Sequence, residues 1–389
     1  MTLSLITLSL MAQSCSTAKR KPVGERGDDS QPVEFVDLPS KDALPGELFR
    51  IPASKPLEDW SLDVELNRGR IVLHPDDGLG FFAYNPDFTD EHCRLLAKIP
   101  RLASISLFRD GSMTAYGAAL LANCSTLRNV ELTLTRNLDA WTVELARNTA
   151  LERVYIHEAD DRLTDDQVSR LATLPSLRFL TLQQCWNVKG DFLARGFSKL
   201  ESLRLVQIPH DTGEDPTISM DLERYIAALP DLKNLTLAQF TVLRELRLDV
   251  LLSCPKLEEI TLNCNGYSGI YCRIGFPPSA SLKVFRFTRN WMGELDKTTL
   301  NALPLLLPQL RELDLSGCVL TSGVAPWVER FKHLEQIDLS ETEVGAETVA
   351  LISEHPKIEK IVLRECKTLI EQNVEDLRRS YPSKEFIHP

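Results

Sequence analysis

The chain has 389 residues, of which 43% are hydrophobic and 25% are charged. This balance is typical of globular proteins and excludes intrinsic disorder of the whole chain. Asp and Glu outnumber Lys and Arg by 55 to 44, for a net charge of −11, so the basic surface of a duplex nucleic-acid binder is not expected. No apolar run approaches the ~18 residues of a transmembrane helix, and nine cysteines are too few for a disulfide scaffold.

The first 18 residues carry no charged side chain, and residues 3–11 form an apolar stretch with the length of a signal-peptide core. Ser14 and Cys15 follow this stretch. The segment 1–18 resembles the lipobox of bacterial lipoproteins, which implies lipidation of Cys15 and a place at the cell envelope. Two features oppose export, because no Lys or Arg precedes the stretch and three basic residues, 19–21, follow it. The alternative is a mildly apolar, frayed N-terminus.

Residues 19–56 are rich in charged residues, Pro and Gly and poor in apolar ones, which predicts a flexible linker. Within them, residues 44–48 read LPGEL and resemble the opening of an F-box. Pro52 and Pro56 would interrupt the helices of such a domain. We expect residues 57–101 to form an N-terminal cap that includes the apolar segment 71–73.

The pattern L-x-x-L-x-L recurs eleven times from residue 102 onward, at spacings between 23 and 32 residues. All three apolar positions of every frame hold Leu, Ile, Val or Phe, and Phe285 and Phe287 are the bulkiest. We therefore expect all of these residues in the core. The first positions of the frames are Leu102, Leu127, Leu151, Leu177, Leu200, Leu232, Leu257, Leu282, Leu310, Leu334 and Ile358.

Six frames follow a proline by two residues. Because proline ends a helix and favours an extended residue before it, each unit is predicted to close a helix, turn and begin a strand. Thr164 and Gln167 have the spacing of a helix capping box. Thr89, Thr114 and Thr321 are expected to act as simpler helix caps.

The period, the frame and the helices between frames resemble the leucine-rich-repeat family over residues 86–389. Three units place a cysteine after the motif, at Cys185, Cys318 and Cys366, which is similar to the cysteine-containing and ribonuclease-inhibitor-like types. The resemblance implies an α/β solenoid, a horseshoe with parallel strands on the concave side and helices on the convex side. About eleven repeats would occupy residues 102–381, and residues 382–389 would end the C-terminal cap.

Two units are irregular. The unit after Leu200 spans 32 residues and carries an insertion over residues 209–216. Its acidic residues do not supply the ~6–8 oxygen ligands of a Ca²⁺ site, so a solvated loop is expected; they are Asp211, Glu214 and Asp215. A second group matches the motif only 11 residues after Leu232 and is predicted to form a convex helix; it comprises Leu243, Leu246 and Leu248.

Catalytic motifs are absent, because the sequence contains no GxSxG, HExxH, Walker A or CxxC pattern and its seven histidines are scattered among different units. We expect no catalytic residue, no metal and no cofactor. Cys318 and Cys366 lie two units apart, ~10 Å on a sheet with ~4.8 Å between strands. This exceeds disulfide reach and predicts buried thiols. Cys264 and Cys272 flank a loop and would pair in an oxidising compartment.

The x residues of the frames are predicted to face outward on the concave side, because side chains alternate along a strand. Aromatic and Arg side chains are frequent interface anchors, although surface filling is the alternative. The residues assigned to partner binding are Phe108, Arg109, Tyr155, His157, Phe179, Gln183, Arg204 and Arg286. Arg286 and Arg289 also lie near Glu312, Asp314 and Asp338, which favours a cross-strand charge ladder for this group.

The repeats without a catalytic constellation predict a non-enzymatic module that binds a protein through its concave face, tethered at the bacterial cell envelope. Contact with a membrane would then occur only through the lipid anchor, and no nucleic-acid partner is expected. Two alternatives stay open. One is an intracellular adaptor, such as the substrate receptor of a ubiquitin ligase. The other is a regulator that covers an enzyme's active site, as ribonuclease-inhibitor-like proteins do.

Overall fold

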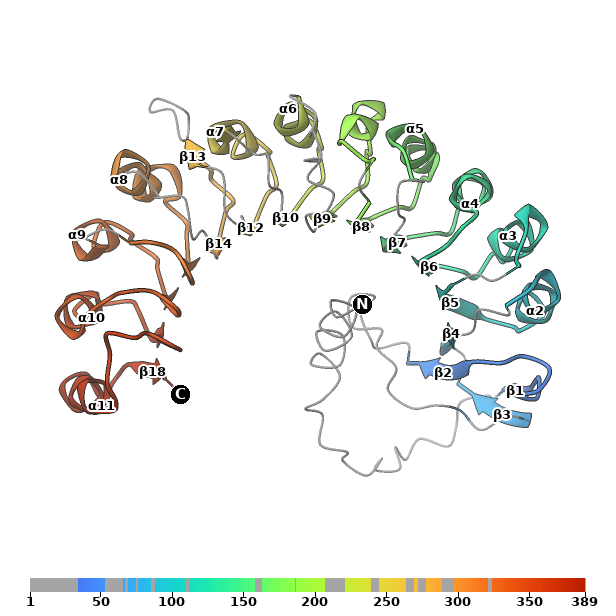
Figure 1. Cartoon of the computed structure of the whole chain (residues 1–389), viewed down its shortest axis with the longest axis horizontal. Coiled ribbons are helices and arrows are strands. Elements are labelled where there is room, and N and C mark those ends of the chain that lie inside the picture. The colour runs from blue at the N-terminus through green and yellow to red at the C-terminus, as the bar shows by residue number, and fades with distance from the viewer. Residues whose placement is uncertain are drawn as a thin grey trace, which may run out of the picture.

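The computed structural model describes residues 34–52, 66, 69–74, 76–84, 88–109, 112–157, 163–185, 187–206, 221–238, 245–263, 269–271, 278–288, 297–320 and 324–388. These residues form a horseshoe with strands along its inner rim and helices along its outer rim (Figure 1). The expected α/β solenoid is therefore confirmed.

Among the described residues, one sheet of fourteen strands lines the inner rim, and its strands follow one another in the order of the chain. Neighbouring strands are parallel, except that β2 runs antiparallel to β4. The strands are β2 (Glu47–Ile51), β4 (Gly78–Tyr84), β5 (Leu102–Phe108), β6 (Asn129–Thr133), β7 (Arg153–His157), β8 (Phe179–Gln183), β9 (Ser202–Val206), β10 (Asn234–Ala238), β12 (Glu259–Asn263), β14 (Val284–Thr288), β15 (Glu312–Asp314), β16 (Gln336–Asp338), β17 (Lys360–Val362) and β18 (Glu385–Ile387).

The repeat frames are in register from one strand to the next. Leu203 on β9, for example, is paired with Leu180 on β8 and Leu235 on β10. Every apolar frame residue is at most 5% exposed, including Phe285 and Phe287, so the predicted core is confirmed. Each such side chain stabilises the fold by ~1.5–3 kcal/mol through burial, and only the stack of units buries it.

Helices cover the convex side of the sheet (Figure 1). They begin where the sequence supplies caps: Thr89 and Thr114 precede the first two, and Thr114 Oγ1 accepts a hydrogen bond from the Tyr116 amide at 3.2 Å. The helices are α2 (Asp90–Leu96), α3 (Ala115–Ala122), α4 (Leu138–Leu145), α5 (Asp165–Ser169), α6 (Leu222–Ala227), α7 (Leu248–Leu251), α8 (Lys297–Leu306), α9 (Val324–Val328), α10 (Ala346–Ser353) and α11 (Glu371–Ser380). Short 3-10 turns occupy Arg170–Thr173 and Asp191–Arg195.

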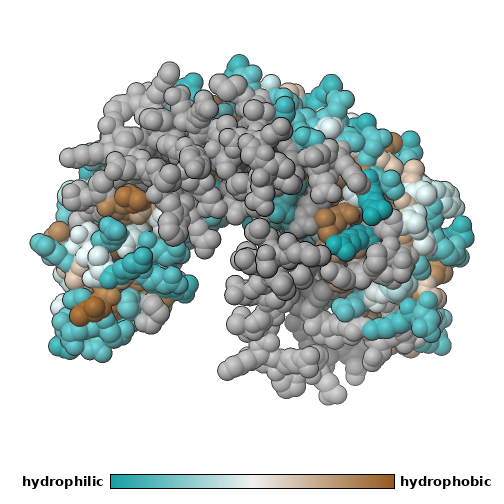
Figure 2. Space-filling model, viewed as in Figure 1, coloured by the Kyte–Doolittle hydropathy of each residue, from teal (hydrophilic) through white to brown (hydrophobic). Residues whose placement is uncertain are grey.

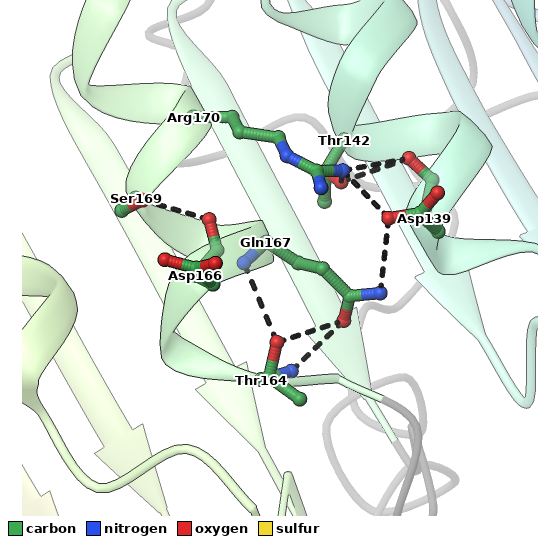
Figure 3. Close-up of polar contacts among 7 residues, drawn as sticks. All are labelled: Asp139, Thr142, Thr164, Asp166, Gln167, Ser169 and Arg170. Atoms are coloured by element: carbon green, nitrogen blue, oxygen red, sulfur yellow. Dashed lines mark hydrogen bonds and ion pairs between the residues drawn. The ribbon is translucent and has the colours of Figure 1, made fainter.

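A polar cluster joins α4 to α5 and includes the predicted capping box (Figure 3). The Thr164 amide donates to Gln167 Oε1 at 2.9 Å, and the Gln167 amide donates to Thr164 Oγ1 at 3.5 Å. Gln167 Nε2 and the Arg170 guanidinium both donate to Asp139 Oδ1, at 3.3 and 2.7 Å. Arg170 holds the pKa of Asp139 below its ordinary value. The cap therefore also links two neighbouring units.

The predicted linker is wrong over residues 34–52, which form two strands of the N-terminal cap. β1 (Glu34–Leu38) pairs antiparallel with β3 (Gly69–Leu73), and β2 closes the first edge of the main sheet against β4. Leu44 and Leu48 of the LPGEL segment are fully buried, and Leu48 lies in a strand. This strand contradicts the helical start that an F-box requires.

The first structural unit precedes the first leucine frame. In β4, Phe81 and Ala83 are paired with Ile105 and Leu107 of β5, and both are buried. The helix α2 then follows, as in later units. The expected cap over residues 57–101 thus contains one unit of the solenoid that lacks the repeat motif.

The segment that matches the motif out of phase is not a convex helix throughout. Residues Glu245–Arg247 form strand β11, which pairs in parallel with β13 (Gly269–Tyr271) on the outer side of the horseshoe (Figure 1). Leu246 therefore lies in a strand and Leu248 begins the short helix α7, while Leu243 lies outside the described residues.

The cysteines after the motif are buried free thiols, as expected for Cys318 and Cys366. Each thiol donates to a backbone carbonyl of the preceding unit: Cys185 to Ile156 at 3.7 Å, Cys318 to Phe287 at 3.0 Å and Cys366 to Leu339 at 3.2 Å. They link the corners of neighbouring units.

Several predictions fall outside the described residues, namely those for residues 1–18 with Cys15, the insertion 209–216, Cys264, Cys272, Arg289 and Thr321.

Candidate functional site

The concave face presents two regular columns of side chains between the buried frame residues. The strand register places Glu131, Tyr155, Thr181 and Arg204 side by side on β6, β7, β8 and β9, and the central column continues in the same way to β17. Neighbouring residues of a column are therefore one strand spacing apart, ~4.8 Å. The order predicted from the frames is confirmed.

The predicted residues on β7, β8 and β9 form one group together with Arg153, and we call this group the β7–β9 surface; it comprises Arg153, Tyr155, His157, Phe179, Gln183 and Arg204. The Tyr155 hydroxyl donates to Gln183 Oε1 at 2.9 Å. The Tyr155 and His157 rings are stacked, with centroids 6.0 Å apart and planes 28° apart. These contacts hold the tyrosine ring in one orientation, which lowers the entropy cost of binding to it.

Phe179 supports this surface rather than presenting its ring to solvent. The Arg153 and Arg178 Cζ atoms lie 4.8 and 5.3 Å from its ring centroid, within the range of cation–π attraction. Phe179 is consequently only 8% exposed. The sequence did not assign Arg153 or Arg178 to the site, because neither residue's frame position reveals which ring it covers.

His157 is also a supporting residue, since it is 4% exposed. Its Nε2 atom lies 2.9 Å from Gln184 Oε1, and burial lowers the pKa of the imidazole. Gln184 has a left-handed backbone with φ 53° at the end of β8, where its amide donates to the Val206 carbonyl. This uncommon conformation aims the glutamine side chain at the histidine.

Arg204 and Arg286 have opposite surroundings in the same column. Arg204 is exposed and forms no ion pair with the described residues. Arg286 binds Glu259, and its Nε and Nη2 atoms lie 3.0 and 2.8 Å from Glu312 Oε1. The predicted charge ladder is thus present at Arg286 and Glu312, and this arginine is already neutralised within the chain. Burial raises the pKa of the nearby Asp314 carboxyl, which stands opposite Asp338.

Phe108 and Arg109 form a separate pair. They lie at the end of β5, two strands away from β7, and the Arg109 Cζ atom is 5.6 Å from the Phe108 ring centroid. Arg109 also has a left-handed backbone with φ 58°. The structure therefore does not bring this pair into contact with the Tyr155 ring.

A second charge ladder runs along the edge of the sheet and was not predicted. It uses the residue after the first leucine of five consecutive frames, and we call its members the edge ladder: Arg128, Glu152, Arg178, Glu201 and Lys233. Arg178 Nε donates to Glu201 at 2.6 Å, and Lys233 lies 2.8 Å from the same carboxylate. Arg178, opposed by partial desolvation and aided by Lys233, lowers the pKa of Glu201 to about 2. The alternation of charge along the repeats was a sequence signal for it.

Comparison with known proteins supports the fold. The sequence matches no family model and no curated protein. One matching solved structure is a TLR13–ssRNA13 complex, at 20% identity and a TM-score of 0.50, covering 69% of this chain and 36% of the other. This chain thus spans about a third of that chain's length. The chain folds as a leucine-rich-repeat solenoid. A yeast Rad7–Elc1 complex also matches, at 15% identity, a TM-score of 0.46 and 77% coverage of each chain.

The described part of the solenoid holds no group of three His, Cys, Asp or Glu residues placed to bind a metal ion, and none of its helices has the length and apolarity to cross a bilayer.

A groove of about 380 Å³ lies at the corners of the last units and is lined in part by Val319, Glu341, Glu343 and Glu365. The arm that carries these C-terminal units shows isolated hydrophobic areas in Figure 2.

Proposed function

We propose that this chain is a non-enzymatic module that holds a protein partner against its concave face. The observation that carries the proposal is the β7–β9 surface, where Tyr155 is fixed by Gln183 and stacked on His157. A fixed aromatic residue and an exposed arginine, Arg204, two strands away on the same face are residue types typical of interface hot spots. The net charge of −11 favours a protein over a nucleic acid, because phosphate contacts need a basic surface.

The test compares two double variants of the full chain as bait for partners from an extract of the source cells. Tyr155→Ala with Phe179→Ala removes the aromatic part of the β7–β9 surface. Tyr116→Ala with Phe35→Ala makes the same changes at exposed residues, 53% and 58% accessible, outside the concave face. We expect the first variant to lose at least ~10-fold of the captured partner and the second to retain it.

The two double variants must be compared at equal folded fraction, which thermal unfolding monitored by circular dichroism measures. Phe179→Ala also removes a largely buried ring, so some loss of stability is expected. Equal capture by the wild-type chain and the Tyr155/Phe179 variant would contradict the proposal, since neither the Tyr155 ring nor the Phe179 ring that supports the surface would then be needed.

We further propose that a lipid on Cys15 tethers the module at the cell envelope. The apolar residues 3–11 followed by Ser14 and Cys15 support this proposal. The measurement is mass spectrometry of the mature N-terminus together with detergent phase partition. A lipidated N-terminal Cys15 in the detergent phase is expected, and Cys15→Ser should abolish it whereas Cys124→Ser should not. A water-soluble chain that retains Met1 would contradict the tether and leave the concave-face proposal standing.

A further inference from the structure

We propose that the concave face selects a partner segment with carboxylate groups over β8 and β9 and cationic groups over β15 and β16. The inference rests on the proposed function and specifies the chemistry of the partner at that same surface. The argument for this selection is that some charged groups on the concave face are already paired within the chain, whereas others are available to a ligand.

Gln183 and Arg204 form the part of the concave face that would bind the partner's carboxylate. Gln183 Oε1 is occupied by the Tyr155 hydroxyl, so the Nε2 group of Gln183 supplies donors. Arg204 is exposed and has no ion pair within the described residues. The two side chains come from adjacent strands at diagonal positions of the register, ~7–8 Å apart at the backbone, which lets long side chains meet. An amide donor and a guanidinium donor that can reach the same group suit a carboxylate.

Two other arginines of the concave face are already held by contacts within the chain. Arg153 lies over the Phe179 ring with its Cζ atom 4.8 Å from the ring centroid. Arg286 is held between Glu259 and Glu312. Over β7 to β14, an acidic segment is therefore directed to Arg204 rather than to these two residues.

The C-terminal end of the wall repels acidic groups. Asp314 and Asp338 stand opposite each other on β15 and β16, whereas Glu312, on the same strand as Asp314, is already paired with Arg286. Each aspartate accepts one backbone hydrogen bond, Asp314 from Ser316 at 2.8 Å and Asp338 from Ser340 at 2.9 Å. Two carboxylates at one strand spacing favour a cation and disfavour a third carboxylate.

The site at Gln183 and Arg204 lies a defined distance from the carboxylates on β15. From β9, the strands β10, β12 and β14 intervene before β15, which gives four strand spacings, or ~19 Å. An extended peptide covers this distance in ~6 residues. The wall thus fits a segment whose acidic and basic groups are separated by about that length, lying across the strands.

The test uses fluorescein-labelled peptides and fluorescence anisotropy at ~150 mM salt, where longer-range repulsion by the acidic protein is screened. The probe has four Glu, six alternating Gly and Ser, and four Lys residues. A second peptide replaces the four Lys by Glu. We expect the first peptide to bind the full chain at least 5-fold more tightly than the second. We also expect Arg204→Gln to weaken binding of the first peptide at least 5-fold.

The matched control is Arg224→Gln, which removes the same charge from helix α6, where the side chain is 78% exposed and lies 3.0 Å from Asp221. This control should leave peptide binding unchanged. Equal weakening by Arg204→Gln and Arg224→Gln, or equal binding of both peptides, would overturn the inference. A labelled oligouridylate that binds more tightly than the first peptide, and whose binding depends on Arg204, would also overturn it, since the concave face would then recognise phosphates.

The failure of this inference can be told from the failure of the proposed function. If Tyr155→Ala with Phe179→Ala abolishes capture of the cellular partner while Arg204→Gln changes neither capture nor peptide binding, the concave face binds a partner and the charge selection is wrong. If neither variant affects capture, both are wrong.

Discussion

The inner wall over β7–β9 and the inner wall over β14–β16 are built on the same buried frames but present different chemistry. On β7–β9, ring stacking and one hydrogen bond fix the tyrosine, and Arg204 is left without an ion pair among the described residues. On β14–β16, Arg286 is held by two glutamates. The repeat therefore dictates where a side chain stands, while the choice of its neighbours decides whether that side chain serves stability or binding.

The largest expected effect is common to both regions. Leu203→Ala on β9 and Leu313→Ala on β15 each remove a fully buried frame residue, and each should lower the free energy of unfolding by ~2–5 kcal/mol. Urea unfolding monitored by circular dichroism measures it. A difference of more than ~3 kcal/mol between the two variants would show that the two regions do not share an equivalent core.

The next effect separates the two arginines. Arg286→Leu leaves two part-buried glutamates without their partner and should cost ~1–2 kcal/mol, between the values for exposed and buried ion pairs. Arg204→Leu should change stability by less than ~0.5 kcal/mol, because an exposed group without a partner is lost. Chemical unfolding of both variants at pH 7 provides the measurement. Equal costs would remove the distinction between the structural and the binding arginine.

The edge ladder should contribute less. The folded-state pKa of Glu201 is lowered to about 2, below its unfolded value of ~4.3. Its contribution is thus present above pH ~4.3 and is lost as the pH falls toward 2. Glu201→Gln should cost up to ~1 kcal/mol at pH 7 because the pairs are part-exposed. The cost should shrink at pH 3 and in high salt, and a cost that grows on acidification would contradict the ladder's role.

The last prediction concerns the pH dependence of stability at His157. Burial lowers its folded-state pKa below the unfolded value of ~6.5, so the unfolded chain binds the proton first and stability falls as the pH drops below ~6.5. His157→Gln should flatten the stability profile between pH 7 and pH 5 relative to the wild type. Thermal unfolding across this pH range tests the effect. If stability changes with pH to the same extent in both proteins, protonation of His157 does not contribute to the pH dependence.

The sequence predicts the solenoid because its period is carried by residues that the fold must bury. Every apolar frame residue fulfils this expectation, and the strand register then follows from the frames, as for Tyr155 opposite Thr181. The strands within residues 34–52 escape prediction because this part of the chain lacks the motif and its Leu44 and Leu48 are buried where β2 pairs with β4, which is distant in the sequence. A periodic sequence pattern indicates how one repeat packs on the neighbouring repeats. It does not indicate how the N-terminal cap packs on the first repeat.

The candidate site is only partly predictable for a related reason. The columns place Tyr155 and Arg204 on the concave face, yet exposure depends on long side chains from adjacent strands. Phe179 is covered because Arg153 and Arg178 lie over its ring, and Arg286 is neutralised by glutamates one strand away on either side. The sequence shows the edge ladder as alternating charge after the first leucines of five consecutive frames, a position that a search for outward-facing strand residues does not include.

The central claim, that the concave face over β7–β9 holds the partner, is tested most directly by site-specific photo-crosslinking. A photoreactive phenylalanine analogue replaces Thr181, which stands between Tyr155 and Arg204 in the central column, or Arg147, whose exposed side chain follows the convex helix α4. We predict a covalent adduct with the partner from position 181 and none from position 147. An adduct from position 147 with none from position 181 would contradict the account.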